Sequence, residues 1–155
     1  MSDQDSIDGL NFCAIGLSNG QNGTFGMVML WNPPNSGRLL LVRRVVIIGT
    51  FPTTTAFDLR KSNVQLGTPL VPPRTFNKRF TGPTSVAQVS NYDSATIPGT
   101  PPMHEFWIGT PNTDHTYDFG EDPYIVDPGW GIFTAAASTG GYNITTWHYK
   151  ELTPA

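Results

Sequence analysis

The chain has 155 residues, which most simply form one domain, and its formal net charge of −3 disfavours general nucleic-acid binding. Its 16 Gly and 14 Pro lack the three-residue period of collagen, and the 9 Phe, 5 Tyr and 4 Trp argue against disorder. The single cysteine, Cys13, excludes an intramolecular disulfide and is expected to be a buried, unreactive side chain.

The first nine residues differ from the rest of the chain. They carry Asp3, Asp5 and Asp8 and lack the apolar core of a signal peptide. We expect an N-terminal arm over residues 1–9, disordered in isolation or ordered against a partner, followed by one domain over 10–155. No apolar run approaches the ~18 residues that span a membrane, so no membrane contact is expected.

The first predicted strands lie on either side of a proline-rich turn. Residues 25–31 carry apolar side chains on both faces, which is typical of a strand covered on both sides. Two prolines followed by Asn, Ser and Gly predict a turn at 32–37. The run 38–48 is rich in leucine and β-branched residues and predicts the centre of a sheet.

The next predicted strand has one apolar and one charged face. Residues 55–60 alternate, with Phe57 and Leu59 inward and Asp58 and Arg60 outward. This alternation is typical of a strand that covers a core on one side.

The second half of the chain contains further strands between turn-rich connections. Residues 84–97 form either a short helix or a strand, and residues 103–108 form a strand. Residues 131–136 and 142–151 predict a hairpin closed at Gly140-Gly141. About eight short strands separated by turns indicate an antiparallel sandwich or barrel.

Two adjacent arginines interrupt the longest apolar run. Arg43 and Arg44 are sequential, so a regular strand directs one to each face. At least one is therefore expected to be buried or at an interface, paired with an acid or with carbonyls. That partner lies either in the same chain or in a neighbouring subunit.

Basic residues are concentrated in the first half of the chain. Eight of the nine Lys and Arg residues precede residue 80, whereas eight of the twelve Asp and Glu residues follow it. Either the halves interleave and the charges mix, or an acidic face meets a basic face of a neighbouring subunit.

No segment shows a recognisable active site. His104, His115 and His148 lack metal-ligand spacings, and the adjacent His104 and Glu105 point to opposite faces of a strand. The acidic segment 114–122 lacks the spacing of a calcium loop and is expected to be a solvated loop. Nucleophile elbows and phosphate loops are absent, and glycosidase carboxylates leave no mark in a sequence. We expect no enzymatic activity, no metal, no cofactor and no small-molecule substrate.

Residues 74–80 interleave aromatic and basic side chains, as single-strand nucleic-acid binders do. One such segment in an acidic chain does not predict nucleic-acid binding. Its phenylalanines are expected to pack on the sandwich or on a neighbouring molecule.

Four features together resemble small virion proteins of tailed bacteriophages. They are the turn Asn32-Pro33-Pro34-Asn35-Ser36-Gly37 before a long apolar strand, the Thr-rich strand 53–60, Pro128-Gly129 before the closing strands, and the ending from Trp147 to Glu151. The resemblance spans residues 25–152. It implies an all-β fold, an antiparallel β-sandwich of jelly-roll type with about eight strands and long loops rich in Pro and Gly.

The resemblance also implies a structural role without catalytic residues. The expected protein is a capsid decoration or cement protein that bridges and stabilises capsomers. Its partners are the major capsid protein and copies of itself, in a dimer or trimer. It would be made in the host cytoplasm and lie on the capsid surface of the virion. The side chains expected at its interfaces are Asp3, Asp5, Asp8, Arg43, Arg44, Arg74, Phe76, Lys78, Arg79 and Phe80.

The alternative is a receptor- or glycan-binding module of a phage tail or head fibre. In that case Trp130, Tyr124 or Tyr117 would stack on sugar rings.

Overall fold

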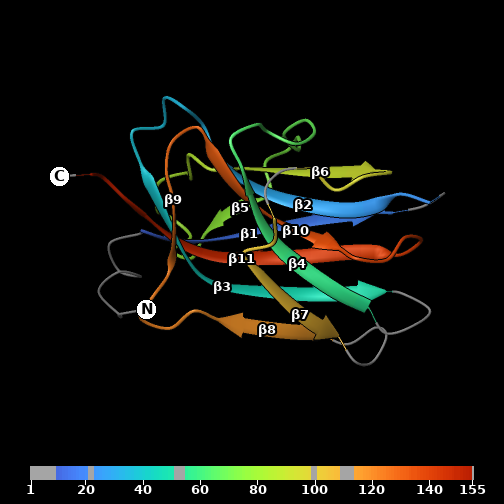
Figure 1. Cartoon of the computed structure of the whole chain (residues 1–155). Coiled ribbons are helices and arrows are strands. Elements are labelled where there is room, and N and C mark those ends of the chain that lie inside the picture. Colours follow the sequence, from blue (N-terminus) through green and yellow to red (C-terminus); the bar gives the residue numbers. More distant parts are fainter. Residues whose placement is uncertain (1–9, 21–22, 51–54, 99–100, 109–113, 155) are drawn as a thin grey trace.

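The computed structural model describes residues 10–20, 23–50, 55–98, 101–108 and 114–154. These residues form two antiparallel sheets that pack face to face (Figure 1). No helix occurs within these ranges, so the predicted all-β sandwich is confirmed. None of the described segments has the helical length and apolarity needed to cross a membrane.

Among the described residues, sheet A has six strands and sheet B has five. Sheet A contains, in spatial order, β5 (Thr75–Asn77), β1 (Asn11–Asn19), β11 (Tyr142–Leu152), β3 (Leu39–Thr50) and β8 (Asp114–Asp118), and β9 (Tyr124–Val126) also pairs with β3. Sheet B contains, in spatial order, β6 (Gln88–Ser94), β2 (Phe25–Asn32), β10 (Trp130–Ala136), β4 (Thr55–Ser62) and β7 (His104–Ile108).

The described strands number eleven, where about eight were predicted. β5 and β9 have three residues each. β8 lies in the acidic segment that was expected to be a solvated loop, and that expectation is wrong. Its backbone pairs with β3, and its residues alternate between exposed and half-buried. Within residues 84–97 the strand alternative is the right one, because β6 pairs with β2 along its whole length.

β2 is covered on both sides, as its sequence predicts. Val28 and Leu30 point into the main core between the sheets. Met27 and Met29 point to the outer face of sheet B, where a second buried cluster includes Leu66. Leu66 belongs to the segment that follows β4, so a loop of the chain itself helps to bury this part of the outer face of sheet B.

The predicted hairpin between β10 and β11 is wrong. β10 pairs with β2 and β4 in sheet B, whereas β11 pairs with β1 and β3 in sheet A. The connection is therefore a crossover between sheets, and the Gly20 N–H donates to the Gly141 carbonyl oxygen at 2.9 Å. Gly140 has φ +85°, which the Gly-Gly pair allows in a crossover as readily as in a hairpin.

Candidate functional site

The outer face of sheet A carries apolar side chains that remain accessible. In β1 the inward residues Phe12 and Ala14 are buried, whereas the outward Ile15 and Leu17 are 38% and 44% exposed. Tyr142 at the start of β11 is 39% exposed. This surface differs from the outer face of sheet B around Met27, Met29 and Phe133, where the apolar side chains are buried together with Leu66.

The strand register aligns apolar side chains across sheet A. Leu17 lies opposite Ile144, which in turn lies opposite Ile48. In the adjacent row Ile15 and Val46 lie on either side of Thr146. We call Ile15, Leu17, Val46, Ile48, Tyr142 and Ile144 the outer apolar face. Scattered exposed apolar residues are common on proteins, but a contiguous patch is typical of an interaction surface.

Arg43 and Arg44, the two arginines that interrupt the apolar run of β3, lie at one end of this face. Trp147 pairs with Val45 and Tyr149 with Val42, so the register shifts between these two pairs. Such a bulge gives β3 an extra residue, and Val42 and Val45 both point into the core. Arg43 and Arg44 therefore share the outer face. The expectation that they point to opposite faces is wrong, because it assumed a strand without a bulge.

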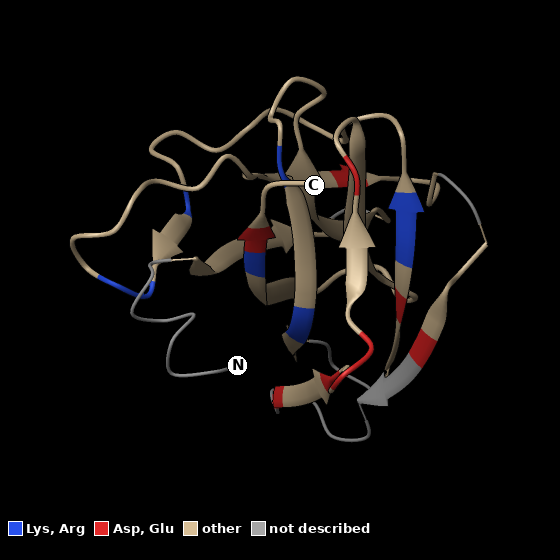
Figure 2. Ribbon diagram, turned by 90° about the vertical axis from the view of Figure 1, so that its left-hand side faces the viewer, with Lys and Arg blue, Asp and Glu red and all other residues tan. Residues whose placement is uncertain are grey.

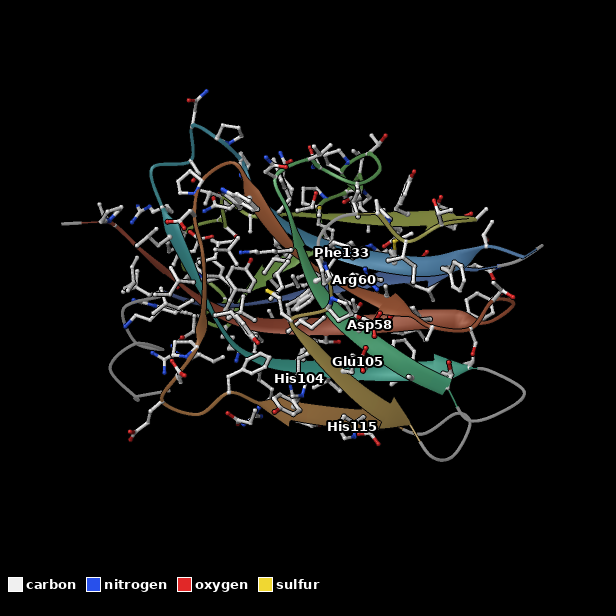
Figure 3. All side chains as sticks on the ribbon, in the orientation of Figure 1. Asp58, Arg60, His104, Glu105, His115 and Phe133 are labelled. Carbon is white, nitrogen blue, oxygen red and sulfur yellow. The ribbon has the colours of Figure 1, made fainter. Side chains whose placement is uncertain are left out.

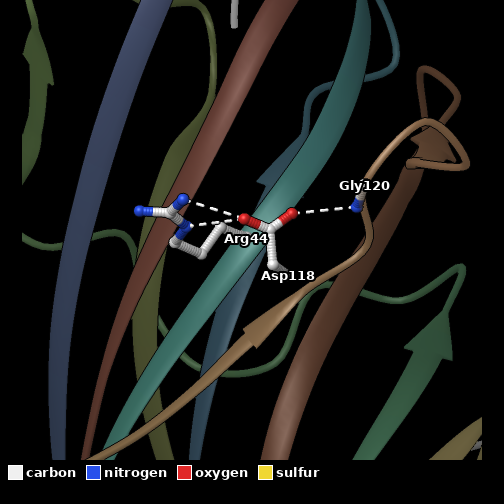
Figure 4. A network of polar contacts seen from close by, with 3 residues as sticks. All are labelled: Arg44, Asp118 and Gly120. Atoms are coloured by element: carbon white, nitrogen blue, oxygen red, sulfur yellow. Dashed lines mark hydrogen bonds and ion pairs between the residues drawn. The ribbon is translucent and has the colours of Figure 1, made fainter.

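Arg44 has a partner within the same chain (Figure 4). Its Nε and Nη2 atoms donate to Asp118 Oδ2 at 3.2 and 2.8 Å. The Gly120 N–H donates to Asp118 Oδ1 at 2.8 Å. That backbone hydrogen bond, followed by the one from Arg44, lowers the pKa of Asp118 below its usual value.

This ion pair joins the base-rich half of the chain to its acid-rich half. A second ion pair, between Arg60 and Asp58 at 2.8 Å, lies within sheet B. Five of the nine Lys and Arg residues lie on strands (Arg43, Arg44, Arg60, Lys61 and Lys150), and Figure 2 shows blue and red segments on neighbouring strands. This placement follows the interpretation in which the halves interleave and their charges mix.

The two arginines line a cleft of about 300 Å³ at the bulge. Its other side chains include Lys78 and His148, with Asp118 and Glu121 on the acidic side. We call this the basic cleft. Burial lowers the pKa of Lys78, although the nearby Cys13 thiol counteracts part of that shift. Burial also raises the pKa of the half-buried Cys13, so its thiol stays protonated at neutral pH.

His148 makes the protein sensitive to acid. Burial first, and then the cations Lys78 and Arg44, lower the pKa of His148 from 6.5 to about 4. Between these two values the unfolded chain binds a proton that the folded chain does not. This group therefore does not reduce the free energy of unfolding above pH 6.5. As the pH drops from 6.5 towards 4, the free energy of unfolding falls, because protonation favours the unfolded chain.

We expect His148→Gln to reduce the loss of stability between neutral pH and about pH 4. Urea unfolding midpoints at both ends of that range measure the effect. His115→Gln, on β8, which β3 separates from β11, is the control. Equal acid sensitivity of wild type and His148→Gln would contradict this assignment.

The remaining predicted interface residues surround β5. Phe76 is 47% exposed in β5, and Phe80 is fully exposed, so Phe80 does not pack on the sandwich. Arg74 and Arg79 are also exposed. Phe76 lies opposite Cys13, next to the outer apolar face. Asp3, Asp5 and Asp8 lie outside the described residues.

The aromatic residues of the glycan hypothesis lie along a groove at one side of the sandwich. Trp130 and Tyr124 line a cavity of about 440 Å³ together with Lys61 and Asp127. The Lys61 ammonium lies 5.6 Å from the centre of the Trp130 ring. Tyr124 also lines an adjacent cavity of about 330 Å³ that contains Tyr117. Burial raises the pKa of Tyr124, so its hydroxyl remains a donor.

Two carboxylates lie opposite each other on sheet B. Asp58 pairs in register with Glu105, and Figure 3 shows both beside Arg60. The Arg60 guanidinium binds Asp58 Oδ2 at 2.8 Å, which compensates the like charges on adjacent strands. The rings of His104 and Tyr117 pack together, with their centroids 4.3 Å apart, whereas Glu105 is exposed. Within the described ranges, no three His, Cys, Asp or Glu side chains are placed to hold a metal.

Sequence reasoning missed the strand that carries Ile15 and Leu17, two of the six residues of the outer apolar face. Residues 11–19 were not predicted as a strand, although Phe12 and Ala14 alternate with Ile15 and Leu17. That alternation, with apolar residues on both faces, was the available signal. Comparisons of the chain with protein-family models, with curated proteins and with solved structures found no match.

Proposed function

We propose that the protein is a structural virion protein of a tailed bacteriophage, a capsid decoration protein that binds the assembled shell and has no enzymatic activity. The observation that carries the proposal is the outer apolar face, where Ile15, Leu17 and Tyr142 are 38–44% exposed on one side of sheet A. An exposed apolar sheet face of this kind fits burial against another protein. The resemblance of residues 25–152 to virion proteins supplies the class of partner.

The strand order supports a jelly-roll fold. Four strands of sheet A follow the order β1, β11, β3, β8, and four of sheet B follow β2, β10, β4, β7. Among the described strands, the chain stays within one sheet only at β6–β7 and β8–β9, and every other connection passes to the opposite sheet. Two Greek keys wound in this way make the eight-stranded jelly roll, which recurs in capsid proteins. β5, β6 and β9 are then additions to the eight strands.

Binding to the shell explains how such a protein stabilises a capsid. A ligand that binds only the assembled shell shifts the equilibrium towards assembly by mass action. Burial of apolar surface between neighbouring capsomers provides the free energy, at about 25 cal/mol per Å². This role requires copies of the protein on the virion and a shape-complementary partner, but no reacting group.

Purification of intact particles tests the proposal. We expect the protein to co-purify with them, in a copy number proportional to that of the major capsid protein. Particles without the protein should lose their genome at a lower temperature. A protein that is absent from particles, or present only at the tail, would contradict the decoration role.

The aromatic groove favours glycan binding as the second candidate function. Trp130 and Tyr124 line one cavity with Lys61 and Asp127, so ring faces and polar groups occur together, as in a sugar site. We expect Trp130→Ala to weaken binding to a glycan identified on an array by about tenfold or more. Phe80→Ala, an exposed aromatic outside the groove, is the control. Failure to bind any arrayed glycan would eliminate this candidate.

A further inference from the structure

The basic cleft contains a cationic side chain that lacks an acceptor. The Arg43 Nε atom is buried, yet it has no hydrogen-bond partner. Arg43 also makes no ion pair with any described residue, whereas Arg44 beside it is paired with Asp118. A buried charged donor without an acceptor is costly, and native proteins satisfy such groups with protein, water or a bound ion.

The other groups around the cleft leave an excess of positive charge on the side of Arg43. Asp118 accepts hydrogen bonds from Arg44 and from the Gly120 N–H, so its carboxylate is already engaged. Glu121 is exposed at the rim of the cleft. Lys78 approaches from β5, and His148 from β11 is neutral near pH 7 and has a buried Nδ1 without a partner.

The bulge is what makes this arrangement possible. Without the extra residue in β3, one of the two arginines would point into the core. With it, Arg43 and Arg44 lie side by side on the outer face of sheet A, opposite His148. Bulges of this kind redirect side chains and are frequent next to functional sites.

We propose that the basic cleft binds an oxyanion, a carboxylate or phosphate group that accepts hydrogen bonds from Arg43 and is attracted by Lys78. A planar guanidinium suits such a group because it can donate two parallel hydrogen bonds. The cleft, at about 300 Å³, has room for a phosphate or for the end of an acidic side chain.

The oxyanion has two sources. One is a free anion such as inorganic phosphate. The other is a protein carboxylate, and the chain has three within residues 1–9, Asp3, Asp5 and Asp8. The Lys78 N–H donates to the Asn11 carbonyl oxygen at 3.0 Å, so the cleft lies close to where β1 begins. This inference does not depend on the decoration role.

Nuclear magnetic resonance of the full chain at about pH 6 tests the proposal. The probes are the Nε–H signal of Arg43 and the ring signals of His148, during titration with sodium phosphate at constant ionic strength. We expect saturable shifts of both probes. Arg43→Gln should raise the Kd for phosphate about tenfold or more, Arg43→Lys should do so less, and Lys150→Gln should leave it unchanged.

The triple variant Asp3→Asn, Asp5→Asn, Asp8→Asn distinguishes the two sources. If carboxylates of the chain occupy the cleft, the Arg43 signal differs between wild type and the triple variant, and phosphate binds the variant more tightly. If that difference disappears on dilution, the carboxylates come from a second copy. If the two proteins bind phosphate equally, the ligand is a free oxyanion. The absence of saturable shifts in both proteins, together with identical Arg43 signals, would overturn the proposal.

Discussion

Leu17→Glu is expected to weaken binding of the protein to its particle by about thirtyfold or more while leaving the fold intact. Leu17 is 44% exposed on β1, in the middle row of the outer apolar face, opposite Ile144. A carboxylate at this position removes apolar area from the interface and must lose its water on binding. Central interface residues cost about 2 kcal/mol or more when altered, which corresponds to roughly a thirtyfold weaker complex.

Co-sedimentation with particles that lack the protein measures this effect, and the urea midpoint confirms that the variant folds. Ile15→Glu, in the adjacent row of the face, should give the same result. Val64→Glu is the matched control, because Val64 is 64% exposed and lies in the segment that leads from β4 to Leu66. If Val64→Glu and Leu17→Glu weaken binding equally, the outer apolar face is not the interface.

Features that depend on local alternation could be predicted from the sequence. β2 has apolar residues at every position from Met27 to Trp31, and the structure covers both of its faces. β4 places Phe57 and Leu59 in the core and Asp58 and Arg60 on the other face, as predicted. In both strands the period of two decides the outcome without knowledge of the neighbouring strand.

Features that depend on pairing between distant segments could not be predicted in the same way. The turn at Gly140-Gly141 permits either a hairpin or a crossover between sheets. Which of the two forms depends on the strands that pair with β10 and β11, and these include β2 in sheet B and β3 in sheet A. The bulge at Arg43 also involves β11, far away in sequence. The sign of the bulge in the sequence was the three-residue spacing between the inward-facing Val42 and Val45, because inward residues of a regular strand are two residues apart.

The structure explains the motif from Trp147 to Glu151 at the end of β11. The side chains of Trp147 and Glu151 both point inward and are buried. Glu151 Oε1 accepts hydrogen bonds from the Ser85 hydroxyl and, at 2.9 Å, from the Val86 N–H. The carboxylate therefore fixes the segment before β6 against β11. No pattern around Glu151 indicated this partner, because residues 84–97 were predicted only as a short helix or a strand, without a pairing partner.

The two sheets are joined inside the core by polar side chains, and breaking this network is expected to cause the largest loss of stability. Asn143 of β11 is fully buried. Its Nδ2 donates to the Gly26 carbonyl oxygen and to Thr134 Oγ1, both at 3.1 Å, across to sheet B. Its Oδ1 accepts from the Thr145 hydroxyl at 2.7 Å. We expect Asn143→Leu to reduce the free energy of unfolding by about 2–3 kcal/mol, because buried polar groups lose their partners.

Urea unfolding measures this loss as a lower midpoint with an unchanged slope. Asn35→Leu makes the same chemical change at an exposed turn and should have little effect. Adding Thr134→Val and Thr145→Val to Asn143→Leu removes the stranded hydroxyls, so the triple variant should regain part of the stability. An unchanged midpoint for Asn143→Leu would mean that packing alone holds the sheets together. A triple variant less stable than Asn143→Leu would show that the hydroxyls, which lie 2.7 Å apart, stabilise the core without the amide.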